Sequence, residues 1–319
     1  MSTLKAERPA SRSAPAPRRP SPRRGRRDGQ GRLAAVLLLP ALITVFGVVI
    51  YPIVRTLIVS LFDVKSALAV SPSFVGLDNY VTVLTNSGFW DAMGRTLYFT
   101  IVSTSLELVL GLGIAFLLNA RIRGRWLLCA VVVVPWAVPT IVNAALWKGI
   151  FNALYGPLNG VLTQLGLIDG YRAWLGDPFG ALNMVILADA WKTTPLVAIF
   201  LLAGLTTIPR ELYEAARVDR ASSWRIFRSI TLPMLVPSIA IVVVLRTVEA
   251  FKVFDIIYGM TRGGPANGTQ TIAYHAYTTA FSNQEFGLGA AIAYLIVLVI
   301  LILTALYLRL LRRSEMSVL

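Results

Sequence analysis

Four ionisable residues lie within one apolar run in the C-terminal half of the chain. They are spaced by three and alternate in sign: Arg246, Glu249, Lys252 and Asp255. Helical residues three apart are neighbours, so the four could neutralise one another as an ionic ladder that stiffens a helix. Ionisable groups inside a membrane-spanning helix are costly and are usually functional, so part of the ladder could instead face a polar translocation pathway. Both interpretations stay open, because three-residue steps wind around a helix.

Other polar and aromatic residues interrupt the apolar runs. Asp189 and Lys192 form a second pair at a spacing of three, beside Trp191, while Glu107 has no partner that the sequence indicates. A single cysteine excludes an intrachain disulfide, and a single histidine leaves no pair for a metal site or a relay. The sequence has neither a catalytic constellation nor a G-x-x-x-x-G-K-[ST] loop for ATP phosphates. We therefore expect a protein without catalytic residues, metal site or cofactor of its own.

The composition predicts that membrane-spanning helices position these side chains. The chain is 56% hydrophobic and 14% charged, whereas soluble domains are about 45–50% apolar and roughly 25% charged. Apolar runs of about 20 residues predict an all-α polytopic membrane protein with six spans. The spans are expected at about residues 33–54, 96–118, 126–147, 181–206, 235–258 and 286–308. Gly111 with Ala115, and Gly287 with Ala291, have the spacing of small residues at closely packed helix pairs.

The distribution of charge predicts the orientation. Residues 1–32 carry ten basic and two acidic side chains, which gives eight of the net fourteen positive charges. This segment is rich in Pro, Ser and Arg, so we expect a disordered cytoplasmic tail or a contact with anionic lipid. A nucleic-acid arm would need a binding module beside it, and none follows. With the N-terminus inside, twenty-one of the thirty Lys and Arg residues are cytoplasmic and six are outside, which places both termini in the cytoplasm.

A charged stretch separates the fourth and fifth predicted spans. It reads ELYEAARVDRASSWRIFRSITLPML from Glu211 to Leu235. The pattern predicts a first helix to Asp219 and a second helix capped by Ser222 or Ser223, which Leu232-Pro233 would end. Trp224, Phe227 and Ile230 recur every third residue as an apolar ridge. The stretch would be an amphipathic hairpin resting on lipid, or a docking surface for a cytoplasmic partner.

At these residues the sequence resembles the membrane subunits of binding-protein-dependent ABC importers. Those subunits carry a cytoplasmic EAA loop, here residues 207–233, which forms the coupling helix that seats in a cleft of the ATPase subunit. The matching positions are Glu214, Ala215, Ala216, Asp219, Ala221, Trp224, Phe227, Ile230, Leu232 and Pro233. Arg220 stands where the family has glycine. Either the turn keeps a negative φ, or the arginine makes its own contact with the ATPase.

Further segments resemble the maltose-type sugar permeases of that family. They are residues 74–80, 135–139, 191–195, 246–255, 261–265 and 287–291, so the resemblance runs from Leu33 to the C-terminus. It implies a type I ABC importer permease domain at residues 33–319, in a bacterial cytoplasmic membrane. The partners implied are two ATPase subunits that use ATP and Mg, a second related permease, and an extracytoplasmic binding protein. A di- or oligosaccharide such as trehalose or maltose is the expected substrate, although related permeases carry monosaccharides and glycerol phosphate.

A sugar pathway needs aromatic faces near carboxylates or amides. The residues expected to line it are Asn143, Asp189, Trp191, Arg246, Glu249, Asp255 and Tyr258. Two alternatives remain at this stage. One is a self-sufficient secondary transporter or channel that uses the charged fifth span as an ion path. The other is a membrane anchor that recruits a soluble enzyme through the charged stretch.

Overall fold

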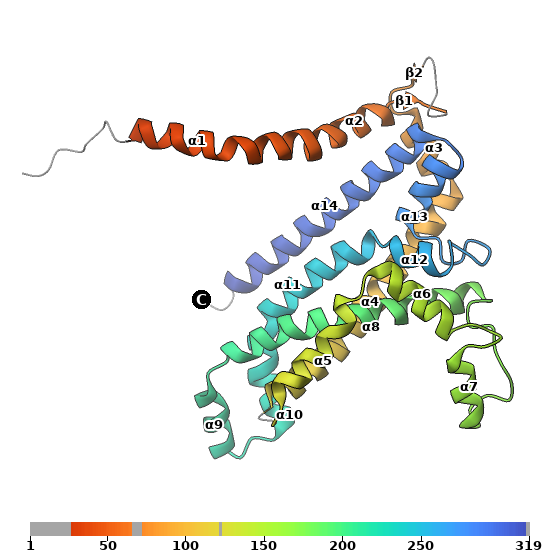
Figure 1. The fold of residues 1–319 in the computed structure, drawn as a ribbon. Helices are drawn as coiled ribbons and strands as arrows, with labels where there is room; N and C mark the ends of the chain where they lie inside the picture. The colour runs from red at the N-terminus through yellow and green to blue at the C-terminus, as the bar shows by residue number, and fades with distance from the viewer. Residues whose placement is uncertain (1–26, 66–71, 121–122, 317–319) are drawn as a thin grey trace, which may run out of the picture. The chain divides into compact units, whose positions relative to one another are not determined.

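The computed structural model describes residues 27–65, 72–120 and 123–316, and most of them are helical (Figure 1). Five of the described helices are long and apolar enough to cross a membrane, or six if one bent pair counts as a single span. The all-α polytopic fold predicted from the sequence is therefore confirmed. The chain divides into two units, residues 1–54 and 55–319.

The described part of the first unit is one apolar helix. It comprises α1 (Arg27–Thr44), the wider turn η2 (Val45–Ile50) and the beginning of α2 (Tyr51–Ser60). Every described side chain from Val36 to Val54 is exposed, and a helix that is apolar all round requires lipid or another protein around it. Because α1 begins at Arg27, residues 27–32 of the predicted tail are helical. Residues 1–26 of that tail lie outside the described residues.

The second unit is built on long helices that pack side by side. They are α4 (Ser87–Asn119), α8 (Pro178–Thr207), α11 (Leu232–Phe251) and α14 (Phe286–Met316). The packing of α4 against α8 is close: a Cβ atom on Gly111 would lie 2.7 Å from Cγ1 of Val197. Ala115, one turn further on, is fully buried in the same apolar cluster. The close packing predicted from the spacing of Gly111 and Ala115 is thus confirmed, and α11 packs across both helices.

The third predicted span, residues 126–147, is not one straight helix. The chain forms α5 (Arg125–Ala137) and α6 (Thr140–Ile150), which meet at 92°. Pro139 lacks an N–H, and its ring disfavours a helical conformation at the residue before it. Val138 is accordingly extended, with φ −70° and ψ 128°. The prediction of an unbroken span was wrong at this point.

The fifth predicted span, residues 235–258, also breaks. Helix α11 ends at Phe251, and a new helix, α12 (Asp255–Met260), follows after three residues. The hydroxyl of Thr271 donates a hydrogen bond of 2.9 Å to the carbonyl oxygen of Val253. This contact satisfies one backbone carbonyl that the break removes from the helix. Tyr258 therefore lies on α12 and not at the end of a long span.

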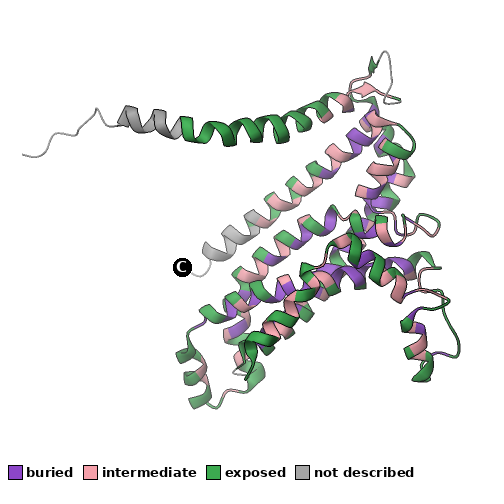
Figure 2. Ribbon diagram, in the orientation of Figure 1, coloured by how far each residue is buried: buried purple, intermediate pink, exposed green. Residues whose placement is uncertain are grey.

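Short elements complete the second unit. Residues Phe62–Asp63 (β1) and Ser73–Phe74 (β2) form an antiparallel pair with Phe62 opposite Phe74. The remaining elements are α3 (Asp78–Thr85), α7 (Pro157–Gln164), α9 (Arg210–Val218), α10 (Ser223–Ile226), η3 (Phe227–Thr231), α13 (Ile272–Tyr277) and η4 (Thr278–Ser282). Figure 2 shows that buried residues gather along α8, whereas the α9 hairpin is largely exposed.

Candidate functional site

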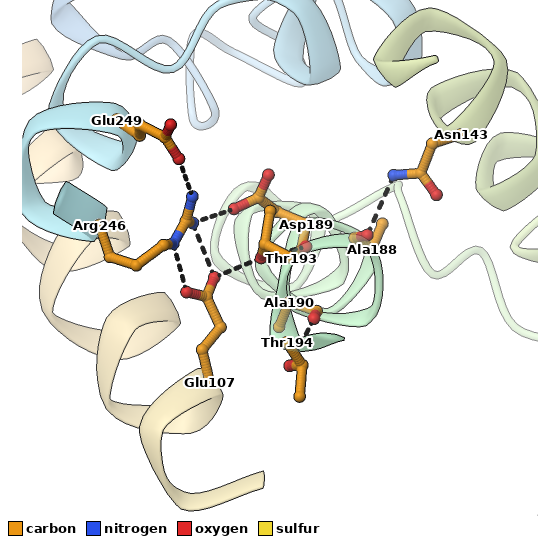
Figure 3. Close-up of polar contacts among 9 residues, drawn as sticks. All are labelled: Glu107, Asn143, Ala188, Asp189, Ala190, Thr193, Thr194, Arg246 and Glu249. Atoms are coloured by element: carbon orange, nitrogen blue, oxygen red, sulfur yellow. Dashed lines mark hydrogen bonds and ion pairs between the residues drawn. The ribbon is translucent and has the colours of Figure 1, made fainter. Parts of the chain in front are cut away.

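A buried cluster of charges joins the three packed helices of the second unit. Arg246 on α11 points at Glu107 on α4 and Asp189 on α8 (Figure 3). Its Nε and Nη2 atoms donate to the two carboxylate oxygens of Glu107, Nη2 to Oε1 over 2.8 Å, so the pair is bidentate. Nη2 also lies 3.1 Å from Oδ2 of Asp189, and Nη1 donates to Oε2 of Glu249 over 2.9 Å. Charge-assisted bidentate bonds of this kind are among the strongest in proteins.

Burial explains why this cluster needs so many hydrogen bonds. Glu107 has no exposed surface, and Arg246 is 4% exposed. A buried ion pair is tolerated only when further hydrogen bonds satisfy its remaining polar atoms. The hydroxyl of Thr193 lies 2.7 Å from Oε1 of Glu107 and 2.7 Å from the carbonyl oxygen of Asp189. The guanidinium group is thereby surrounded by three carboxylates, of which only that of Glu249 is substantially exposed, at 51% of its side chain.

A cavity of about 410 Å³ opens beside this cluster, where both span breaks meet. The buried residues Asp189 and Arg246 line it together with the exposed Glu249, and the break after α11 contributes Lys252 and Asp255. Its other lining residues are Trp136, Thr140, Lys192, Thr193, Leu196, Val253, Phe254 and Ile256. Carboxylates that accept hydrogen bonds and ammonium groups that donate them thus face one space beside aromatic rings. Such a mixture suits a polar solute that also has apolar faces.

The second notable feature is the hairpin formed by α9, α10 and η3. Its turn is centred on Arg220, whose φ is 55°. The N–H of Arg220 bonds to the carbonyl of Arg217 over 3.0 Å, and the N–H of Ala221 bonds to the carbonyl of Ala216 over 2.9 Å. These two bonds, with a left-handed residue between them, are the Schellman motif that commonly ends helices at glycine. The arginine therefore adopts the glycine geometry, and this excludes the first of the two alternatives, a turn with a negative φ.

The second arm of the hairpin begins at a serine cap. The Ser222 Oγ accepts a hydrogen bond of 3.3 Å from the backbone N–H of Arg225, as the sequence predicted. The ring of Trp224 lies 5.5 Å from that of Phe227 and is 67% exposed. Phe227 packs in turn against Phe116 of α4 at 6.0 Å. The apolar ridge is therefore divided: its first residue is free for a partner, and the next holds the hairpin to the spans.

Comparison with known proteins decides the family. The sequence pattern of the family described as binding-protein-dependent transport system inner membrane component matches residues 107–315, which is more than half of the chain. The chain belongs to this family. It is thus a multi-pass permease of the inner membrane, and the predicted resemblance to ABC importer permeases is confirmed.

Individual relatives agree with the family assignment. The permease is 42% identical over 280 residues to the trehalose/maltose transport system permease protein MalF of Thermococcus litoralis, which covers 88% of this chain and 94% of the relative. It is 36% identical over 287 residues to the sulfoquinovosyl glycerol transport system permease protein SmoG of Agrobacterium fabrum, with 90% and 92% covered. A bacterial alginate ABC transporter has the same fold, with a TM-score of 0.78 at 22% identity over 91% of this chain and 98% of that one.

The ionic ladder predicted along the fifth span of the permease forms only at its first step. Arg246 and Glu249 pair, but the described part of the chain contains no ion pair of Lys252 or Asp255. The helix ends at Phe251, so the three-residue spacing no longer brings these side chains together. Asp189 likewise pairs with Arg246 and not with Lys192. Apart from the pair of Arg246 with Glu249, the ion pairs of this cluster join different helices.

Three of the residues predicted for the pathway do not line the cavity. Asn143 is fully buried and donates a hydrogen bond of 3.0 Å to the carbonyl of Ala188, which joins α6 to α8 (Figure 3). The Trp191 ring packs edge-on against that of Trp147 at 5.9 Å. Tyr258 stacks at 5.6 Å on Phe254, which does line the cavity. Asp189, Arg246, Glu249 and Asp255 are the predicted residues that the structure brings together there.

Sequence reasoning missed the partners of Arg246. Glu107 was visible only as an acidic residue in an apolar run, and nothing local indicated what it binds. Thr193 was part of a recognised segment but was given no role, although its hydroxyl contacts Glu107.

The hairpin of the permease also corrects one boundary. Leu232-Pro233 does not end the second helix, because the chain stays helical from Ser223 to Phe251. The wider turn η3 (Phe227–Thr231) precedes the proline, and Pro233 is the second residue of α11. The predicted coupling residues all lie on this hairpin or at its junction with α11. Glu214, Ala215, Asp219, Arg220, Trp224 and Pro233 are exposed, and Ala216, Ala221, Phe227, Ile230 and Leu232 are half-buried.

Proposed function

We propose that this chain is one permease subunit of an ATP-driven importer for a di- or oligosaccharide. Two ATPase subunits, a second related permease and an extracytoplasmic binding protein would complete the complex. The family and the names of two relatives, one for trehalose/maltose and one for sulfoquinovosyl glycerol, support a glycoside as the substrate. Trehalose or maltose is the first candidate.

The single observation that supports this function most strongly is the mixed cavity beside Arg246. Sugar hydroxyls would donate to Glu249 and Asp255 and accept from Lys252, while the ring of Phe254 would stack on a C–H-rich face. Arg246 would mainly hold the site together, because three carboxylates already occupy four of the five N–H donors of its guanidinium group. The more exposed side chains of the cavity would then bind the solute.

The broken helices fit a translocation pathway. Non-helical backbone within a membrane is tolerated where it lines a cavity, and transporters commonly place substrate sites at interrupted helices. Both breaks, after Ala137 and after Phe251, lie beside this cavity. Movement of α6 and α12 relative to α5 and α11 would change which side of the membrane the cavity faces.

The hairpin at residues 207–233 would couple this movement to ATP hydrolysis in the partner subunits, which use ATP and Mg. Glu214, Ala215 and Asp219 would contact the ATPase from α9, and the exposed ring of Trp224 would be the apolar anchor. Tryptophan is enriched among residues that dominate binding energy at protein interfaces. With the hairpin in the cytoplasm, both chain termini are cytoplasmic as well.

The test is solute uptake by the purified complex in proteoliposomes, with the binding protein outside and ATP inside. We expect ATP-dependent uptake of a disaccharide. Asp255→Asn should lower uptake about tenfold, which corresponds to losing roughly one charge-assisted hydrogen bond. Asp169→Asn, an exposed carboxylate that does not line the cavity, is the matched control. Uptake without ATP by this chain alone would contradict the proposal. Uptake of glycerol phosphate in place of a disaccharide would contradict the proposed substrate class and leave the proposed ATP-driven import standing.

A further inference from the structure

A second cavity, of about 690 Å³, is bordered by α9 and shares no lining residue with the solute cavity. The end of α4 contributes Asn119, the end of α8 contributes Thr206, and η3 contributes Thr231. The first residue of α5, Arg125, forms part of its wall together with Arg210 and Arg217 of α9. Three spans and the hairpin thus enclose one polar space.

The cavity is electropositive. Glu214 is its only carboxylate among the lining residues, against Arg125, Arg210 and Arg217. Within the part of the chain that the structure describes, none of these three arginines forms an ion pair. Three guanidinium groups facing one carboxylate leave a formal excess of two positive charges. An anion would supply the partner that the protein itself does not.

Backbone groups reinforce this preference. Helices α5 and α9 both begin at the cavity, and neither Gly124 nor Pro209 before them supplies a side-chain cap. Their first N–H groups, which no side chain caps, would be available to an anion. The ends of α4 and α8 contribute carbonyl groups of the opposite sign, with about half a charge per helix end. The partial charges of two helix N-termini and two helix C-termini offset each other. The arginine side chains therefore determine the sign of the electrostatic potential in the cavity.

The surroundings favour a lipid as the source of the anion. The cavity lies at the ends of the apolar helices α4, α5 and α8, where the phosphate groups of a surrounding bilayer would be expected. Trp126, next to Arg125, is 76% exposed, as is typical of tryptophan at a membrane interface. Leu117 on α4, and Leu127 and Val131 on α5, are exposed apolar side chains of two helices that border the cavity. They offer a path for acyl chains.

We propose that this cavity binds the phosphate group of an anionic phospholipid between the spans and α9. The phosphate would bridge Arg125 of α5 to Arg217 of α9, and the acyl chains would follow the exposed apolar residues of α4 and α5. Basic pockets between spans on the cytoplasmic side bind anionic headgroups in this way. The lipid would fix the distance of α9 from the spans. A consequence for ATPase coupling rests on the proposed function, but lipid binding itself does not.

The experiment is native mass spectrometry of the purified complex after addition of phosphatidylglycerol or phosphatidylcholine. The variant is Arg125→Gln/Arg217→Gln, and the control is Arg225→Gln/Arg228→Gln, which removes equal charge from hairpin positions that do not line the cavity. We expect phosphatidylglycerol to remain bound to the unmodified complex and to the control, with about tenfold lower occupancy in the variant. Phosphatidylcholine should be retained by none of them. An unchanged melting temperature and retained ATPase subunits establish that the variant folds.

Other outcomes would overturn the proposal. Equal retention of phosphatidylglycerol by variant and control would exclude the cavity, and equal loss from both would indicate only general attraction to charge. A parallel titration with inorganic phosphate distinguishes the source of the anion. Stabilisation by phosphate that needs Arg125 and Arg217, with no retained phosphatidylglycerol, would replace the lipid by a soluble anion. A complex that binds the lipid but imports no sugar would refute the proposed function and leave this inference standing.

Discussion

Arg246 and Glu107, which lie 139 residues apart in the sequence, form a bidentate ion pair between α11 and α4. The same guanidinium group reaches Asp189 on α8, so one side chain ties together three helices of the second unit. Its removal would leave two carboxylates in a region that has almost no exposed surface. The pair is for this reason the point where the helix packing is most sensitive to a single substitution.

Replacing Arg246 by methionine should destabilise the permease strongly. Breaking a buried ion pair by removing one partner costs about 3–5 kcal/mol, because the remaining charge is left uncompensated. Thermal unfolding of the detergent-solubilised complex measures the effect. Glu249→Gln is the matched control, because it alters the one carboxylate of the cluster that is substantially exposed. Melting temperatures that fall equally in both variants would show that the buried ion pair contributes no more to stability than the exposed one.

Gly111→Ala should destabilise the contact between α4 and α8. The added methyl group would lie 2.7 Å from Cγ1 of Val197, and overpacking of this kind typically costs 1–3 kcal/mol. Gly113→Ala, two residues further along the same helix, adds a methyl group where nothing lies within 4 Å. It should leave the melting temperature unchanged or raise it, since alanine favours helix over glycine. Val197→Ala should restore the stability of the Gly111 variant; failure of this rescue would contradict the steric explanation.

Glu214→Lys should uncouple the permease from its ATPase partners without unfolding it. Glu214 is exposed on α9, so reversing its charge breaks no buried contact. We expect loss of sugar uptake and weaker co-purification of the ATPase, at an unchanged melting temperature. Glu211→Lys makes the same charge change earlier on the same helix, at a position outside the EAA pattern, and should retain more activity. Full uptake by the Glu214 variant would count against a coupling role.

Arg220→Gly tests why an arginine occupies a left-handed position. Glycine adopts a φ of 55° without strain, whereas another residue in this conformation costs roughly 1–2 kcal/mol. The substitution should therefore leave the hairpin at least as stable. If the arginine contacts the ATPase, the variant should bind that subunit more weakly, as measured by co-purification at increasing salt. Equal binding would leave the arginine without a role at the interface.

The sequence was sufficient for the features that depend on local pattern. Apolar runs located the spans, and the spacing of Gly111 and Ala115 predicted a close helix contact. A helix cap was predicted at Ser222 or Ser223 from their position before an apolar ridge, and the structure has it at Ser222. The kink after Ala137 could also have been predicted, since Pro139 by itself disfavours a continuous helix.

Features that depend on distant residues could not be predicted. The end of α11 at Phe251 is stabilised by Thr271, eighteen positions beyond the carbonyl that it binds. The ladder failed for a related reason: Arg246 found its strongest partner on α4, and the spacing along α11 contained no information about that helix. The turn at Arg220 kept the geometry of a glycine that the sequence lacks, because its two backbone hydrogen bonds depend on no side chain.

The residues around Arg246 that hold the helices together differ from those that line the cavity, and this separation has an evolutionary consequence. The groups that fasten the helices together, Arg246 and Glu107, are buried, whereas Lys252 and Asp255 face the cavity without an ion-pair partner in the described chain. Under the proposed function, substitutions at these exposed positions would alter which solute binds without disturbing the helix packing. A permease built in this way could change its solute specificity through single substitutions.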